Sequence, residues 1–208
     1  EPDFQRLCTR CGECLRVCPT GGLQLAGLQE GIEGLWLPQL VPRIGHCTRN
    51  CTACGRVCPT GAIRPLTLAQ KHTVAIGKAS IDRGRCIPWG WYFEREGSPS
   101  AGADPGPDRN CAVCEEVCPV PTKAIRFAVY RTTGPDGVVE IRRPYVIEAL
   151  CTGCGFCEYA CPLPGDAAIR IVGGRGSAAV EEQPPTLSLD EHLLPATVAG
   201  FHRQGGIS

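Results

Sequence analysis

The apolar residues of this chain occur in short runs that alternate with polar residues, a pattern typical of β-strands. We expect one strand at 73–81, and a hairpin with strands at 125–130 and 138–141 joined by an Asp-Gly turn. A further strand is predicted at 145–147. Glycines interrupt the apolar residues of 24–46, which indicates a strand and an irregular excursion rather than a long helix.

Four short motifs, each rich in cysteine, share one organisation. Each has three cysteines and then a fourth, which comes four residues after the third and immediately before a proline. A step of four residues is about one turn of helix, and the proline ends that turn. An apolar residue follows a few positions later, at Leu23, Ile63, Ile125 and Ile169. The predicted repeat unit is therefore a loop, one turn of helix and a short strand.

The first and fourth motifs are regular, and the middle two are not. Glycine follows the second cysteine of the regular motifs, at Gly12 and Gly155, where we expect the unusual backbone dihedrals that a tight loop requires. The irregular motifs have Thr52 and Ala112 at that position, and their first cysteine is displaced. In the third motif the long segment 87–110 separates the first cysteine from the other three.

The four motifs together use all sixteen cysteines of the chain. Three thiolates at two-residue spacing and a fourth beside a proline form the ligand pattern of bacterial ferredoxins, in which the last cysteine of each motif ligates the other cluster of a pair. Disulfide frameworks do not repeat this spacing, and zinc sites take two ligands from each of two CxxC pairs. We therefore predict four [4Fe–4S] clusters whose iron is bound by Cys8, Cys11, Cys14, Cys18, Cys47, Cys51, Cys54, Cys58, Cys86, Cys111, Cys114, Cys118, Cys151, Cys154, Cys157 and Cys161.

The composition indicates a fold that depends on metal. The chain contains 26 glycines and 19 prolines, and aromatic residues make up only 6%, which is a poor supply for an apolar core. Ligand bonds can replace the missing hydrophobic burial, so we expect the chain without clusters to be largely unfolded. The predicted fold class is small α+β, with two bacterial-ferredoxin-like modules of two clusters each, built from short helices and hairpins around a metal-dependent core.

Three segments are expected. Residues 1–172 form the double ferredoxin-like body, and residues 87–110 form an insertion loop within it. Residues 173–208 contain no cysteine and are predicted to be an extended tail with a short helix at 187–194. The insertion begins with aromatic residues that either cover a cluster and exclude water or form a docking surface for a redox partner: Trp89, Trp91, Tyr92 and Phe93.

Charge and hydropathy exclude some functions. The formal net charge is zero, and no basic stripe with interleaved aromatic residues supports nucleic-acid binding. No apolar run reaches the roughly eighteen residues that cross a bilayer, so we predict no transmembrane segment. Arginines beside the motifs, such as Arg16, either face solvent or donate hydrogen bonds towards clusters, and His46 is either solvated or bonded to a sulfur. No Ser/His/Asp arrangement or phosphate-binding loop indicates catalysis, so we predict a protein that is not an enzyme by itself.

With its motifs placed, the chain resembles the polyferredoxin electron-transfer subunits of bacterial respiratory systems, in particular the NapG/MauM ferredoxin type. The resemblance covers roughly residues 4–172, and the stretched third motif is its most specific feature. It implies four [4Fe–4S] clusters and a periplasmic location, reached by twin-arginine export of the folded protein. The chain contains no methionine, which fits either a removed leader or a truncation.

Two pairings of the motifs are open. Sequential pairing joins the first motif with the second and the third with the fourth. Nested pairing joins the first with the fourth and the second with the third, as in related respiratory iron–sulfur subunits, and the regularity of the two end motifs favours it. Nesting predicts one module from 1–30 with 140–172 and another from 40–135. Its ligand sets are Cys8/Cys11/Cys14/Cys161, Cys151/Cys154/Cys157/Cys18, Cys47/Cys51/Cys54/Cys118 and Cys86/Cys111/Cys114/Cys58.

The resemblance implies an electron relay. Single electrons pass between a membrane quinol-oxidising or haem partner and a periplasmic reductase or dehydrogenase, in association with a membrane complex. The alternative is a permanent iron–sulfur subunit of a larger molybdopterin or nickel–iron oxidoreductase. A redox sensor that uses cluster loss as a signal is a third hypothesis, which the plain tail does not support.

Overall fold

The computed structural model describes residues 2–90, 110–134 and 137–173. All of these residues belong to one unit of the chain, Glu1–Ala178. Most of the insertion predicted at 87–110 and nearly all of the predicted tail, with its short helix, lie outside the described residues.

Each cysteine motif contains one short helix that carries its third cysteine, as the spacing predicts. These helices are α2 (Glu13–Arg16), α4 (Ala53–Val57), α7 (Val113–Glu116) and α8 (Phe156–Ala160). The fourth cysteine of each motif lies just beyond the helix and precedes a proline, which cannot continue it. The helices pack in pairs, α2 against α4 and α7 against α8.

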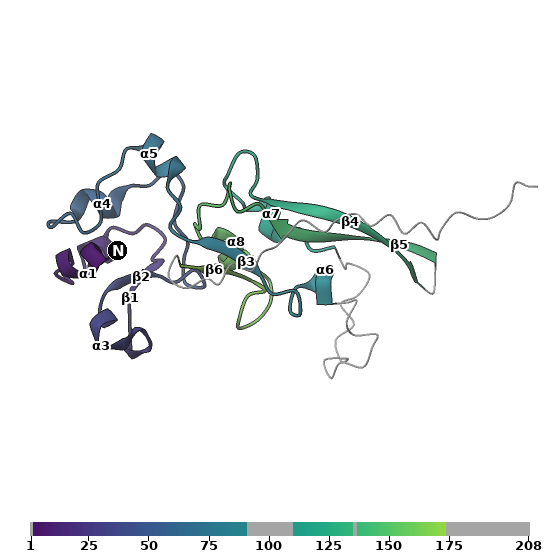
Figure 1. Cartoon of the computed structure of the whole chain (residues 1–208), viewed down its shortest axis with the longest axis horizontal. Helices are drawn as coiled ribbons and strands as arrows, with labels where there is room; N and C mark the ends of the chain where they lie inside the picture. The colour runs from purple at the N-terminus through teal and green to yellow at the C-terminus, as the bar shows by residue number, and fades with distance from the viewer. Residues whose placement is uncertain (1, 91–109, 135–136, 174–208) are drawn as a thin grey trace, which may run out of the picture. The chain divides into compact units, whose positions relative to one another are not determined.

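The described part of the chain contains three two-stranded antiparallel sheets (Figure 1). The first pairs β1 (Leu23–Leu25) with β2 (Pro38–Leu40). The second pairs β3 (Lys78–Ile81) with β6 (Ile169–Val172), which brings distant parts of the sequence side by side. The third is a long hairpin of β4 (Ile125–Gly134) and β5 (Gly137–Val146).

The other helical elements within the described ranges are also short. They are α1 (Pro2–Leu7), η1 (Leu28–Glu30), α3 (Gly31–Gly34), α5 (Leu68–Thr73) and α6 (Ile87–Gly90). η1 and α3 lie between β1 and β2, so the predicted irregular excursion after the first motif is confirmed.

The predicted hairpin is confirmed, but three strand predictions are wrong in part. β5 continues to Val146, so the predicted third strand is the end of the hairpin. The strand predicted at 73–81 begins only at Lys78, because α5 occupies the chain up to Thr73. The second motif is not followed by a strand in the described structure. There Pro65 lacks the N–H that a ladder needs.

The apolar core gathers around the third and fourth motifs. It joins buried side chains of β3, β4, β5 and β6 to buried cysteines: Ala79, Ile81, Ile125, Val146, Ile169, Cys86, Cys151 and Cys157. Near the first two motifs the described chain buries few apolar side chains, among them Ala26 and Leu37. The same cysteine motif therefore stands in two different surroundings.

Backbone contacts fasten the second motif to the fourth. The Cys47 N–H donates to the Cys154 carbonyl over 2.7 Å, and the Ile76 N–H donates to the Thr152 carbonyl over 3.0 Å. The first bond joins the loops of two motifs that are about a hundred residues apart in sequence, and the second joins the segment before β3 to the loop of the fourth motif. The two halves of the described chain are thus held together at their cysteine loops.

Two further features close this junction. Gly153 has φ of 67°, and a Cβ there would collide with the backbone of Gly77. The Arg43 guanidinium donates to three backbone carbonyls at the end of the fourth motif, those of Glu158, Cys161 and Leu163, over 3.0 to 3.1 Å. Only glycine permits the close approach, and the guanidinium supplies donors to carbonyls at and just beyond the end of α8.

Candidate metal centres

The loops of the two regular motifs turn as predicted. Gly12 and Gly155 precede α2 and α8 with φ of 76° and 83°, in the left-handed region that favours glycine. Thr52 and Ala112 have φ of −126° and −117° at the corresponding positions. The irregular motifs therefore enter the same helix without a left-handed residue.

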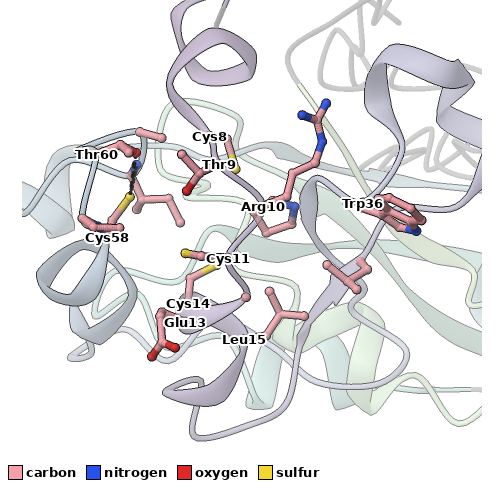
Figure 2. Close-up of a pocket in the computed structure, with 16 residues that line it drawn as sticks. Cys8, Thr9, Arg10, Cys11, Glu13, Cys14, Leu15, Trp36, Cys58 and Thr60 are labelled. Carbon is pink, nitrogen blue, oxygen red and sulfur yellow. Dashed lines mark hydrogen bonds between the residues drawn. The ribbon is translucent and has the colours of Figure 1, made fainter.

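The first group of cysteines, site A, combines the loop of the first motif with the last cysteine of the second. Cys8, Cys11 and Cys14 line one pocket with Cys58. Figure 2 shows the sulfur atoms of all four facing this space. The Ile63 N–H donates to Cys58 Sγ over 3.4 Å.

The second group, site B, is the converse combination. Cys47, Cys51 and Cys54 line a pocket with Cys18, the last cysteine of the first motif. The Thr20 hydroxyl lies 3.5 Å from Cys18 Sγ. Sites A and B thus exchange their fourth cysteines.

Sites C and D repeat this exchange in the second half. Site D contains Cys86, Cys111 and Cys114 from the third motif and Cys161 from the fourth, all lining one pocket. The four cysteines that remain, Cys151, Cys154 and Cys157 of the fourth motif and Cys118 of the third, make up site C. The pKa of Cys154 is raised, mainly by burial. A hydrogen bond from the Phe156 N–H lowers it, and the negative charge of Cys118 raises it again.

This grouping contradicts the nested prediction. Cys58 rather than Cys161 lies with Cys8, and Cys18 lies with the second motif rather than the fourth. The packing of the helices decides the grouping, because the fourth cysteine follows its helix and the helix packs against that of the neighbouring motif. Irregular spacing changes only the loop ahead of the helix, so the regularity of the end motifs carried no information about pairing.

The four sites lie in the order A, B, C, D. α2 and α4, which carry Cys14 and Cys54, join site A to site B. The Cys47–Cys154 hydrogen bond joins site B to site C. α7 and α8, which carry the third cysteines of their motifs, join site D to site C.

Polar groups act on the sulfurs at sites A and B. Burial raises the pKa of Cys58, but hydrogen bonds from the Ile63 N–H and the Thr60 hydroxyl outweigh it, and the pKa is lowered. The pKa of Cys18 is lowered in the same way, because the Thr20 hydroxyl and the Leu23 N–H outweigh its burial. Negative charge on these sulfurs is therefore stabilised by neighbouring donors.

Burial also raises the pKa of Cys14 at site A and of Cys54 at site B, and its effect is larger at sites C and D. It raises the pKa of Cys86 and of Cys114 to about 12, and the charges of neighbouring cysteines add to the effect. Burial also raises the pKa of Cys157. Apolar surroundings disfavour negative charge on these sulfurs.

Lys71 is a functional residue that sequence analysis missed. Its Nζ donates to Cys47 Sγ over 2.9 Å at site B. It lies on α5, which begins with a capping box: the Gln70 N–H donates to the Thr67 hydroxyl, and the Thr67 N–H donates to the side-chain oxygen of Gln70. The Thr-x-x-Gln spacing is a signal for a helix start, and it could have revealed α5 and the lysine one turn into it.

Two side chains near the motifs differ from their predictions. The His46 ring stacks on Phe156, with centroids 3.9 Å apart and an interplanar angle of 3°, so the prediction of a solvated histidine is wrong. Burial lowers the pKa of His46. Arg16 pairs with Glu13 over 3.1 Å on the surface. Trp89 packs against the core beside Cys86, whereas the three aromatic residues after it lie outside the described ranges.

The cysteines fit iron–sulfur clusters. All sixteen lie in the described ranges and all are free thiols. They form four groups of four, which is the ligand number of a [4Fe–4S] cluster. Among the described residues, no three Cys, His, Asp or Glu side chains are close enough to share one metal ion. A cubane does not require this, because its four thiolates bind different iron atoms.

Groups of four cysteines that exchange their last member between paired motifs define an iron–sulfur protein of the ferredoxin class. A family model described as a 4Fe-4S dicluster domain matches residues 7–62 and 109–164, together more than half of the chain. The first match spans motifs one and two, and the second spans motif four and all of motif three except Cys86.

Curated relatives cover most of the chain. The methylamine utilization ferredoxin-type protein MauM of Methylorubrum extorquens is 33% identical over 85% of this chain and 73% of its own length. MauM of Paracoccus denitrificans is 31% identical over 83% and 67%. The ferredoxin-type protein NapG of Haemophilus influenzae is 30% identical over 81% of this chain and 54% of its own length. The chain therefore belongs to the family of ferredoxin-type proteins that includes MauM and NapG.

Comparison with solved structures found no match. Within residues 2–90, 110–134 and 137–173, no helix combines the length and the apolar character needed to span a membrane.

Proposed function

We propose that the protein relays single electrons through four [4Fe–4S] clusters, one at each of sites A to D. The observation that carries this proposal is the unbroken row of sites, in which each site is joined to the next by packed motif helices or by a backbone hydrogen bond. A relay needs such a row, because electrons must pass from each cluster to its neighbour. The membership of the chain in the MauM and NapG family supports the same function.

The proposed ligands follow the grouping of the cysteines. They are Cys8, Cys11, Cys14 and Cys58 at site A, Cys47, Cys51, Cys54 and Cys18 at site B, Cys151, Cys154, Cys157 and Cys118 at site C, and Cys86, Cys111, Cys114 and Cys161 at site D. Each cluster, when bound, accepts and donates one electron. The residues of this chain fix the positions of the clusters and set their reduction potentials through burial, charge and hydrogen bonds to sulfur.

The two ends of the row are the proposed points of electron entry and exit. Site A lies at one end, where Cys11 is exposed, and site D lies at the other, beside Trp89. The partners that we propose are a quinol-oxidising or haem subunit of a membrane complex at one end and a reductase or dehydrogenase at the other. On this proposal the protein is an exported, periplasmic carrier with no catalytic site of its own.

One observation favours a second candidate, a permanent subunit of a larger oxidoreductase. Apolar side chains of the segment between β1 and β2 are unusually exposed, with Leu28 at 75%, Ile32 at 85% and Trp36 at 60%. Trp36 lines the site A pocket (Figure 2). A stable interface would cover such side chains. Elution in fixed stoichiometry with a large subunit favours this candidate, and elution alone favours the carrier.

Electron paramagnetic resonance tests the relay and its ligands together. The reduced protein is expected to contain about sixteen iron atoms and spins from four clusters. Cys8→Ser and Cys58→Ser are expected to alter the same spectral component, and Cys161→Ser a different one. Fewer than four clusters in the protein would overturn the relay. A common component for Cys8→Ser and Cys161→Ser would restore the nested pairing.

A further inference from the structure

Helix α5 holds one ammonium group against site B. None of its residues is buried, so α5 adds no side chain to the core. The capping box at Thr67 and Gln70 fixes its start, and the Lys71 N–H continues the helix by bonding to the Thr67 carbonyl over 2.9 Å. The His72 ring bonds to Asn50 Oδ1 over 3.0 Å and ties the helix to the loop of the second motif. The position of Lys71 is therefore set by α5 and by the cysteine loop itself.

The Lys71 ammonium acts on two of the proposed ligands of site B. Its Nζ lies 2.9 Å from Cys47 Sγ in a half-buried position. Its charge also stabilises the thiolate of Cys54. It lines a pocket shared with Cys154 of site C, but its hydrogen bond is to the sulfur of site B.

The contacts to sulfur at the other sites are uncharged in the described structure. At sites A and C the donors include the backbone N–H groups of Ile63 and Ala79, over 3.4 and 3.3 Å, and the Thr60 hydroxyl lies 3.8 Å from Cys58 Sγ at site A. The ammonium of Lys78 near site C binds the backbone carbonyls of Glu148 and Cys151 instead of a sulfur. At site B the ammonium of Lys71 therefore donates a charged hydrogen bond to a ligand sulfur. The described parts of sites A, C and D have no such bond.

A positive charge at this position favours the reduced cluster. Reduction adds one negative charge, which is shared by the cluster and its thiolates. A charge-assisted hydrogen bond to a thiolate stabilises that charge more than a neutral N–H does. Net charge and hydrogen bonds to the sulfurs are among the factors that set cluster potentials.

We propose that Lys71 makes the cluster at site B the highest in reduction potential of the four, so that the first electron to enter the protein rests there. This inference rests on the proposed relay function. It assigns Lys71 as a tuning residue that acts through Cys47, and it places the resting electron beside the junction with site C rather than at an end of the row.

Redox titration of the full-length protein with its clusters, followed by electron paramagnetic resonance, tests the proposal. Lys71→Gln is expected to lower the reduction potential of one spectral component. The expected change is about tenfold in the reduction equilibrium constant, which is about 59 mV for a one-electron couple. That component is the first to be reduced in the unmodified protein, and it is the one altered by Cys51→Ser. Lys71→Arg is expected to keep most of the potential.

Arg49→Gln is the matched control. It removes one positive charge from the same pocket, and Arg49 makes no hydrogen bond to a sulfur in the described structure. Its shift is expected to be less than a third of that of Lys71→Gln. An unchanged midpoint in Lys71→Gln, an equal shift of all four components, or an equal shift in Arg49→Gln would overturn the proposal.

Two further measurements keep the outcome decisive. If the Lys71→Gln variant loses the site B cluster, the Thr67→Ala variant is measured in its place, because it loosens α5 but keeps the ammonium. Its site B midpoint is expected to fall by a smaller amount, and an unchanged midpoint rejects the role of Lys71. The iron content of the unmodified protein tests the relay separately from the role of Lys71, since fewer than four clusters would reject the relay whatever Lys71 does.

Discussion

The two dicluster domains present the same cysteine motif in different surroundings. In the first domain, residues 7–62, Cys14 is buried, Cys11 is exposed, and the sulfurs meet hydroxyl, N–H and ammonium groups. In the second half, Cys86, Cys151 and Cys157 are buried in the apolar core. The motif specifies how a cluster is held, whereas the surroundings decide how easily it takes up charge. One chain can thus place four chemically identical clusters at different potentials.

The largest expected difference between the domains is in their tolerance of ligand loss. Cys157→Ser places a hydroxyl in the apolar core and is expected to remove at least half of the iron, because site C supports the packing around it. Cys11→Ser, at an exposed position, is expected to remove no more than about a quarter. Iron and acid-labile sulfide per chain measure both. Equal losses would show that core burial does not distinguish the domains.

The junction between the halves can be broken at one glycine. Gly153→Ala is expected to destabilise the fold by about 3 kcal/mol or more, because it adds a collision with Gly77 to the strain of a positive φ. Gly165 has a similar φ of 69° with open space around it, so Gly165→Ala should cost only about 1 kcal/mol.

The thermal midpoint of cluster bleaching compares these two glycine variants. Equal midpoints would mean that the close approach of Gly153 to Gly77 contributes nothing beyond backbone strain.

Reduction potentials sharpen the comparison further. The clusters of sites C and D are expected to have lower midpoints than those of sites A and B, because the burial that raises the pKa of Cys86 and Cys114 to about 12 also disfavours the charge of a reduced cluster. A tenfold difference in the reduction equilibrium is about 59 mV. Titration with Cys11→Ser and Cys111→Ser as markers of sites A and D measures the order. A site D midpoint above that of site A contradicts it.

The smallest expected effect concerns the carboxylate that joins α8 to β6. Glu158 is buried, and its Oε2 accepts the Ile171 N–H over 2.6 Å. Glu158→Ala leaves that N–H without a partner and is expected to destabilise the second half by about 1 to 3 kcal/mol. Glu158→Gln keeps an acceptor and should lie close to the unmodified protein. Thermal unfolding compares the three, and equal losses in both variants would indicate that the charge, not the hydrogen bond, matters.

Local features of the sequence predicted local features of the structure well. The four motif helices, the left-handed Gly12 and Gly155, and the pairing of β4 with β5 follow from spacing and turn chemistry within a few residues. Partnership between motifs could not be predicted in this way. It depends on which helices pack together, and the short helices α2 and α4 carry no outward signal of their partner. The pairing of β3 with β6 is likewise a tertiary outcome.

The missed features of the site have specific causes. Alternation of apolar residues predicts a strand from 73, whereas the capping box at Thr67 and Gln70 starts a helix, α5, that runs to Thr73 and carries Lys71. The stacking of His46 on Phe156 joins residues from the second and fourth motifs, which only the folded junction brings together.

The exchange of fourth cysteines also determines the order in which complete sets of ligands are synthesised. Every cysteine of sites A and B has been synthesised once residue 58 leaves the ribosome, whereas sites C and D wait for residue 161. Cluster insertion can therefore begin on the first domain while the second is still being made. Arg43 and Cys47 then receive the fourth motif as the last part of the described body to be made. The grouping of the cysteines thus gives the first domain complete ligand sets before the second domain has its own.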